Sequence, residues 1–332
     1  MLHNLHYRKW YRQGSAGGRH LCRSGLPAIV ADMGADGAFV VVGAYGIDTN
    51  VYIAGERQGA EMTFAHTTDG LGQAGCYSAL AAAALGVPTR AIAALGDDRL
   101  GAWVREELVE AGVSVTELRD PRGTHRSVNL VAEDGSRRNY FDPRGVSETV
   151  VDPEACRAAL AGARVAHFHL DDWSRRLLPS ARQAGAVVSC DLQDVVDLDE
   201  AYRPDIIEAA HVLFMSAANL DDPAGAALEL ASRRAGRTVV VGAGREGCLV
   251  AVDGAIERHP APDLPGHPVV DTNGAGDNLA VGFLVARYAD AAPVGEAAWR
   301  AQLGARWICS QRGDAKEPVT RERLELLARQ VA

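Results

Sequence analysis

Small residues followed by a carboxylate stand in the segment VVDTNGAGDNLAVGFLVARYA, residues 269–289. Its apolar spacing predicts the end of a strand, a turn and then a helix. Glycines let the backbone approach an anion closely, and the free N–H groups at a helix start attract negative charge. We therefore expect Gly274, Ala275 and Gly276 to form an anion hole. Asp277 beside them could accept a proton from a substrate or simply cap the helix.

The elements that must position this segment alternate between strands and helices. AFVVVGAYGID, from Ala38, predicts a buried strand ending in glycine turns, and GCYSALAAAALG predicts a helix closed by Gly86. TRAIAALGDDRLGAWVREELVEAGV repeats this unit, with a helix ending at Gly112, and RVAHFHL, AVVSCDL, HVLFMS and TVVVGAG predict four more strands. The alternation predicts an α/β fold with a mostly parallel sheet and helices on both faces.

Two β-rich stretches interrupt the alternation, at about residues 49–66 and 124–142. The second contains Asp134-Gly135 between two strand-like runs, which is a hairpin signal. We expect the two stretches to form a small β-sheet over the end of the larger one. Such a sheet would act as a lid that excludes water from the site.

Composition narrows the class of protein. The 332 residues are 47% hydrophobic and carry a net charge of −9, which argues against nucleic-acid and membrane partners. No apolar run reaches the roughly 18 residues of a membrane-spanning helix. Six scattered cysteines without a CxxC pair indicate reduced thiols in a cytoplasm. Residues 1–32 are basic and predict a disordered tail or an extended start, with Met33 an alternative initiator. Residues 33–332 are expected to form one domain.

Two motifs, in this order along the chain, resemble the signatures of the ribokinase-like (PfkB) sugar kinases. GQAGCYSALAAAALG followed by ALGDDRLG resembles the N-terminal signature, and DTNGAGD resembles the C-terminal one. The resemblance covers about residues 38–327 and implies a three-layer α/β/α fold with ATP and Mg²⁺ as cofactors. In that family the aspartate matching Asp277 is the catalytic base, and the residues matching Gly274–Gly276 stabilise the phosphates. Positioning and charge stabilisation of this kind are sufficient for phosphoryl transfer.

The same resemblance places an acceptor site. Asp48, in GAYGID, matches an aspartate that binds sugar hydroxyls, and Gly72, Gln73 and Tyr77 match residues around the substrate. The family usually has a second glycine and an asparagine where this chain has Gln73 and Tyr77. These departures indicate an unusual acceptor, and the aromatic ring of Tyr77 favours one with a ring on which it can stack.

The nucleotide side rests on weaker signals. GAGREG, residues 242–247, matches GxGxxG, but the following CLVAVDGAIERH predicts two strands instead of the helix of a dinucleotide-binding unit. By resemblance, Gly244 and Gly247 border the nucleotide instead, and a plain turn is the alternative. Ser216 begins SAAN where the family has Asn-x-x-Glu, so Mg²⁺ would be held more by ATP phosphates and water.

A monovalent cation is a further implication of the resemblance. The loop with Asp271 and Asn273 matches a loop that borders such a site, which predicts activation by K⁺.

Other residues with chemical potential are weaker candidates. His167 and His169 share a face of a predicted strand, and satisfied histidines are favoured there over a metal site. Asp171, Asp172 and Trp173 follow at the end of that strand, where a substrate contact and a solvated turn are both open. Three arginines could steer a phosphate or simply lie on the surface of the hairpin, and we favour the surface role: Arg126, Arg137 and Arg138.

Together these observations predict an ATP-dependent kinase that phosphorylates a hydroxymethyl group of a sugar or nucleoside. The alternatives are a sensor of such molecules on the same fold without catalysis, and a nicotinamide-dependent oxidoreductase. A homodimer stays open.

Overall fold

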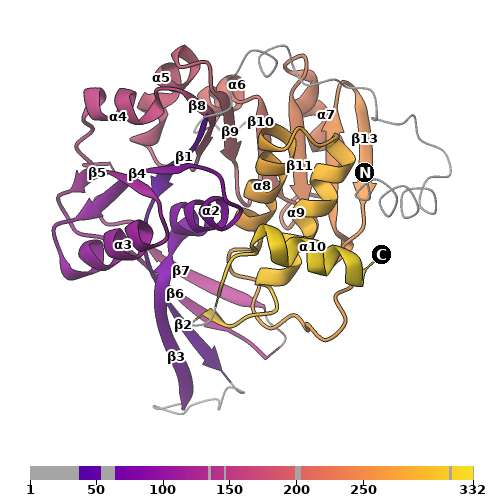
Figure 1. The fold of residues 1–332 in the computed structure, drawn as a ribbon, viewed down its shortest axis with the longest axis horizontal. Helices are drawn as coiled ribbons and strands as arrows, with labels where there is room; N and C mark the ends of the chain where they lie inside the picture. The colour runs from indigo at the N-terminus through magenta and orange to yellow at the C-terminus, as the bar shows by residue number, and fades with distance from the viewer. Residues whose placement is uncertain are drawn as a thin grey trace.

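The computed structural model describes residues 37–53, 64–133, 136–145, 147–198, 203–313 and 316–331. Nine of the described strands form one sheet in the order β13-β12-β11-β10-β9-β8-β1-β4-β5 (Figure 1). All its neighbouring pairs are parallel except β11–β12 and β12–β13 at one edge, which confirms the predicted mostly parallel sheet. These strands are β1 (Ala38–Ala44), β4 (Thr89–Gly96), β5 (Ser114–Asp120), β8 (Ala163–Phe168), β9 (Val187–Asp191), β10 (Val212–Ser216), β11 (Thr238–Gly242), β12 (Cys248–Val252) and β13 (Ala255–His259).

Helices cover both faces of this sheet, because successive strand side chains point to opposite sides. In β1, Val41 belongs to one hydrophobic core, whereas Val40 and Val42 belong to the other. The first core packs α2 (Gln73–Ala84), α3 (Arg99–Glu110), α8 (Ala275–Leu284), α9 (Val294–Ile308) and α10 (Arg321–Gln330). The second packs α4 (Pro153–Leu160), α5 (Leu178–Gln183), α6 (Pro204–Ala209) and α7 (Pro223–Ser232). The three-layer prediction is therefore confirmed.

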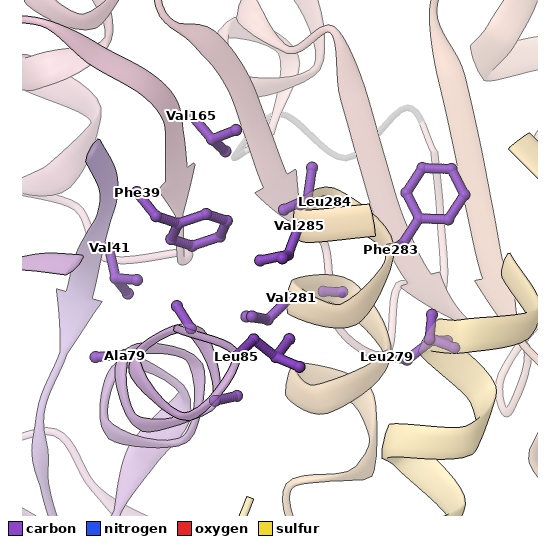
Figure 2. Close-up of a cluster of buried hydrophobic side chains, with 14 of the residues drawn as sticks. Phe39, Val41, Ala79, Leu85, Val165, Leu279, Val281, Phe283, Leu284 and Val285 are labelled. Carbon is purple, nitrogen blue, oxygen red and sulfur yellow. The ribbon is translucent and has the colours of Figure 1, made fainter. Parts of the chain in front are cut away.

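The two helices that begin at the predicted site lie side by side on the first face. Figure 2 shows Ala79 on α2 and Val281 on α8, with Phe39 of the sheet and Leu85 at the end of α2 in the same apolar cluster. The chain after α8 continues as a π-helical turn, Val285–Ala289. This packing fixes the start of α8 relative to the start of α2.

Four strands form a smaller sheet that extends away from the larger one, toward the lower edge of Figure 1. Its order is β3 (Ala65–Gly72), β2 (Gly46–Ile53), β6 (His125–Val131) and β7 (Arg137–Asp142). β6 and β7 pair antiparallel, as the hairpin pattern predicts. The predicted turn residues Asp134-Gly135, the middle of the 49–66 stretch and the whole of 1–32 with Met33 lie outside the described residues.

Two local predictions are wrong. The first strand does not end in a glycine turn, because the single residue Tyr45 separates β1 from β2. Tyr45 is fully buried, and its hydroxyl donates to the carbonyl oxygen of Val41 at 3.2 Å. The residues before the anion hole also form no strand: the N–H groups of Val270 and Asp271 both donate to the carbonyl of Cys309, just past α9, instead of to a neighbouring strand.

No helix in the described part of the chain is long and apolar enough to cross a membrane.

Candidate active site

The predicted anion hole lies at the start of α8. Gly274 is the N-cap of this helix, with φ of 78°, and Ala275 and Gly276 follow in its first turn. A side chain on Gly274 would come within 3.1 Å of the Tyr77 ring, so this position requires glycine for both conformation and space. The Ala275 N–H donates to the Thr272 carbonyl at 3.2 Å, which leaves the N–H groups of Gly274 and Gly276 at this helix start.

Asp277 is the third residue of this helix, within its first turn, and is not its N-cap. The helix has Gly274 as its N-cap and no side-chain cap hydrogen bond, so the capping alternative for Asp277 is wrong. Burial, and then the nearby carboxylate of Asp191, raise the pKa of Asp277 to about 8, while the guanidinium of Arg137 opposes this shift. A carboxylate with a pKa close to neutral pH is suited to accept a proton in catalysis.

Asp191 is a site residue that the sequence analysis did not single out. It ends β9, is buried, and has its pKa raised by that burial, while the N–H of Gln193 donates to its Oδ1 at 2.8 Å. It is also the single acidic residue of the predicted strand AVVSCDL. The general placement of ligands at the carboxyl ends of parallel strands could have identified it.

The carboxylate of Asp48 is the centre of the predicted acceptor site. It lies on β2 and is 3% exposed. Its Oδ2 accepts hydrogen bonds from the Tyr77 hydroxyl at 2.9 Å, from Asn273 Nδ2 at 2.8 Å and from Asn129 Nδ2 at 3.2 Å. The structure thus brings Asp48 and Tyr77 together as predicted. It adds Asn129 on β6 and also Asn273, which the sequence analysis had placed only beside a monovalent cation. No motif marked Asn129, because strand pairing places it here.

The other oxygen of Asp48 is held by Gln73. Oδ1 accepts from the Gln73 backbone N–H at 3.3 Å and from its Nε2 at 3.1 Å, and the same Nε2 donates to Ser127 Oγ at 2.9 Å. Gln73 has a φ of 67°, which glycine adopts far more easily. A side chain on Gly72 would lie 2.2 Å from Asp48 Cγ, so the backbone can pass the carboxylate only as glycine.

Arg137 belongs to the site. Its guanidinium donates to Asn129 Oδ1 at 3.3 Å, and Asn139 Nδ2 donates to the same oxygen at 2.8 Å. The positive charge of Arg137 also lowers the pKa of Asp277. The interpretation of Arg137 as decoration is therefore wrong, because the β6–β7 register turns it toward the network. All three arginines are exposed, and Arg138 lies over the Tyr140 ring instead of contacting the network.

The loop before the anion hole binds a lysine. The Nζ of Lys316 lies 3.2 Å from Asp271 Oδ1 and donates to the Asp271 carbonyl at 3.4 Å and to the Asn273 carbonyl. The hydroxyl of Tyr52 donates to Asp271 Oδ2 at 3.1 Å. Lys316 had no motif to mark it. Its ammonium group takes the oxygens that were predicted to border a monovalent cation.

A pocket of about 600 Å³ opens at the carboxyl ends of β10 and β11, a size that suits a small-molecule ligand. Ser216 and Gly244 line it, together with Arg245 and Asp222. Gly247 is not among the lining residues. It has a φ of 98°, and a side chain there would lie 2.0 Å from the His259 carbonyl oxygen, so both the backbone conformation and the lack of space require glycine at this position.

The chain after β11 excludes the dinucleotide-binding alternative for GAGREG. A short 3₁₀ turn, Gly244–Glu246, leads into the antiparallel pair β12 and β13 instead of a helix, as the sequence predicted.

The remaining candidates lie in the interior. His167 Nδ1 bonds Ser189 Oγ at 3.1 Å and His169 Nε2 bonds Ser78 Oγ at 3.2 Å, and burial lowers the pKa of both histidines. Asp171 and Trp173 are buried, so the solvated turn is wrong for them. Within the described residues, no group of three His, Cys, Asp or Glu side chains could hold a metal ion.

Comparison with known proteins identifies the family of this chain. The model of the pfkB family carbohydrate kinases matches residues 38–321, which is most of the chain. The chain belongs to this family. Its pfkB domain is 34% identical to the acarbose 7(IV)-phosphotransferase of Actinoplanes sp. over 251 residues, covering 74% of this chain and 83% of that protein. It is also 26% identical to the fructoselysine 6-kinase of Escherichia coli over 199 residues, covering 60% and 74%.

Solved structures agree with this pfkB assignment. The microbiome-derived acarbose kinase Mak1 superposes with a TM-score of 0.78 at 32% identity, covering 89% of this chain and all of that one. The ribokinase of Arabidopsis thaliana, solved with ribose and ATP, gives a TM-score of 0.72 at 20% identity over 88% of this chain and 98% of its own. This second likeness shows the shared ribokinase-like fold. As a pfkB kinase, the chain is a phosphotransferase.

Proposed function

We propose that this pfkB kinase transfers the γ-phosphoryl group of ATP to a hydroxymethyl group of a carbohydrate, with Asp277 as the general base. The observation that carries the proposal is the carboxyl group of Asp277, which is not the helix N-cap, has its pKa raised to about 8, and directly follows Gly274–Gly276 in the first turn of α8. A proton acceptor beside an anion hole is the minimum that phosphoryl transfer to an alcohol requires.

The roles of the residues follow from their positions. Asp48 would bind acceptor hydroxyls and orient the reactive one toward Asp277, which accepts its proton. The first-turn N–H groups of α8 would stabilise charge on the transferred group. Ser216 and Gly244 would border the nucleotide, and Gly247 would shape that loop. Mg²⁺ would be held mainly by the ATP phosphates and water, and when bound it would neutralise phosphate charge. Asp191, whose charge acts on Asp277, is the carboxylate left beside the proposed base.

The acceptor class is a carbohydrate more than a nucleoside. Asp48 is surrounded by amides and a hydroxyl, from Gln73, Asn129, Asn273 and Tyr77. Such groups suit a polyhydroxylated ligand. The ring of Tyr77 lies against Gly274, and its hydroxyl bonds Asp48, which argues against its use as a stacking platform for a base. Because two relatives are named for acarbose, that compound is the first acceptor to test.

The test is an ADP-release screen with acarbose, simple furanose and hexose sugars, fructoselysine and nucleosides, and with a control lacking acceptor. We expect turnover with at least one carbohydrate and loss of that turnover in Asp277→Asn. Thermal stabilisation by a sugar without any ADP release would instead favour the sensor alternative. A cytoplasmic location, a homodimer and closure of the small sheet stay predictions.

A further inference from the structure

The buried ammonium group of Lys316 stands at the point where a K⁺ ion was expected. We propose that Lys316 is a built-in cation of the active site, which holds the loop of the anion hole and makes the kinase independent of K⁺. This inference rests on the proposed function, because it assigns Lys316 as a positioning residue for that reaction.

The contacts around the Lys316 ammonium are those of a cation site. It is surrounded by the carboxylate and carbonyl of Asp271 and by the carbonyl of Asn273. Its side chain is 5% exposed and that of Asp271 is fully buried. Burial lowers the pKa of Lys316, and the Asp271 carboxylate opposes that change. An uncompensated charge left at this depth is strongly destabilising, so Asp271 requires a positive partner.

The position of that positive charge bears on the anion hole. The Asn273 carbonyl bound by Lys316 shares its peptide group with the N–H of Gly274. In a planar trans peptide, the C=O and N–H groups point in opposite directions. A hold on the carbonyl therefore also fixes the direction of the first N–H of the anion hole. The Asn273 side chain bonds Asp48, so the same hold reaches the acceptor site.

The choice of lysine supports a specific role. This arginine-rich chain contains lysine at positions 9 and 316 and nowhere else in its sequence. A planar guanidinium suits bidentate pairing, whereas an ammonium is a compact point charge with three donors. An ammonium has nearly the size of K⁺, so it is the side-chain group that best replaces that ion among carbonyl oxygens.

The first measurement compares the unaltered kinase in potassium chloride and in tetramethylammonium chloride at matched ionic strength. We expect equal turnover and equal melting temperature, because the cation position is filled from within. Activation or stabilisation by K⁺ alone would overturn the proposal.

The second measurement uses two substitutions of Lys316. Lys316→Ala removes the charge and leaves space, whereas Lys316→Met removes the charge and fills the space. We expect both to lower turnover about 10 to 10²-fold, since a small misplacement of reacting groups costs up to about that factor. In Lys316→Ala, K⁺ or ammonium should restore turnover and raise the melting temperature, and the bulky cation should not. Lys316→Met should respond to none of them.

A matched control is Arg237→Met. Arg237 is 2% exposed and donates to the carbonyls of Ala210, Leu230 and Ile207, at the opposite ends of the strands. Its loss should lower the melting temperature without rescue by any cation. Absence of rescue in Lys316→Ala, with or without loss of turnover, would refute the built-in cation.

Failure of the proposed function is distinguishable from failure of this inference. If no acceptor is phosphorylated by the unaltered protein, the kinase proposal fails. The melting temperatures in each cation still test Lys316, because they require neither ATP nor an acceptor. If Lys316→Ala folds too poorly to measure, the comparison of cations on the unaltered protein decides.

Discussion

Replacing Gln73 by glycine and by alanine should separate backbone strain from hydrogen bonding at the acceptor site. Gln73 has a left-handed φ of 67°, which costs a residue with a side chain about 1–2 kcal/mol. Its amide offsets this cost with hydrogen bonds to Asp48 Oδ1 and Ser127 Oγ. Strain that persists next to the Asp48 carboxylate is a reason to infer a function for the Gln73 amide.

The magnitudes follow from these contacts. Both variants lose the two side-chain hydrogen bonds, worth about 0.5–1.5 kcal/mol each in net stability. Gln73→Ala keeps the strain and should be destabilised by about 1–3 kcal/mol in total. Gln73→Gly releases about 1–2 kcal/mol of strain but gains about 0.4–1 kcal/mol of unfolded-chain entropy, so it should be more stable than Gln73→Ala by roughly 1 kcal/mol.

The assay is urea unfolding of the parent and both variants, together with steady-state kinetics for the acceptor found in the screen. If the Gln73 amide orients Asp48, both variants should raise the acceptor KM about tenfold, equivalent to about 1.4 kcal/mol, while the ATP KM stays unchanged. Equal stability of the glycine and alanine variants would refute the argument from strain. An unchanged acceptor KM in both would refute the role of the amide.

The remaining predictions concern Asp277 and the charges around it. Asp277→Asn should melt near the parent temperature, still bind ATP, and lose about 10² to 10⁴-fold in turnover, whereas turnover within a few-fold of the parent would exclude it as base. Because only the ionised carboxylate accepts a proton, and the pKa of Asp277 is raised to about 8, kcat/KM should increase with pH and level off above that value. Arg137→Gln should move this rise to higher pH, since it removes a charge that lowers the pKa of Asp277, and an unmoved profile would contradict that coupling. Asp48→Asn should raise the acceptor KM far more than the ATP KM, as measured by ADP release, and equal changes in both would argue against Asp48 as the acceptor carboxylate.

Local patterns in the sequence predict the large sheet and the start of α8 well. Short apolar runs, glycine ends and the DTNGAGD segment are determined by nearby residues, so Gly274 and Asp277 could be placed without the fold. The family resemblance then indicated Asp48, which no local pattern singles out.

The rest of the site depends on contacts between distant segments. Asn129 reaches Asp48 because β2 and β6 pair in parallel, with Asn50 opposite Asn129. Lys316 meets Asp271 across 45 residues of sequence, from a stretch without a motif. Even the placing of Arg137 depends on a strand register. Periodicity predicts which face a residue takes within its own strand, but not which strand lies beside it.

The short connection from β1 to β2 through Tyr45 anchors the strand that carries Asp48 to the core. Tyr45 is fully buried and tied to Val41, and a side chain on Gly46 would lie 2.2 Å from the His125 carbonyl oxygen. Asp48 therefore lies on a strand whose start is held tightly in the core. Any closure over an acceptor would have to bend β2 or twist the small sheet along its length. Because no flexible linker separates β1 from β2, a displacement of the outer strands would also move the Asp48 carboxylate.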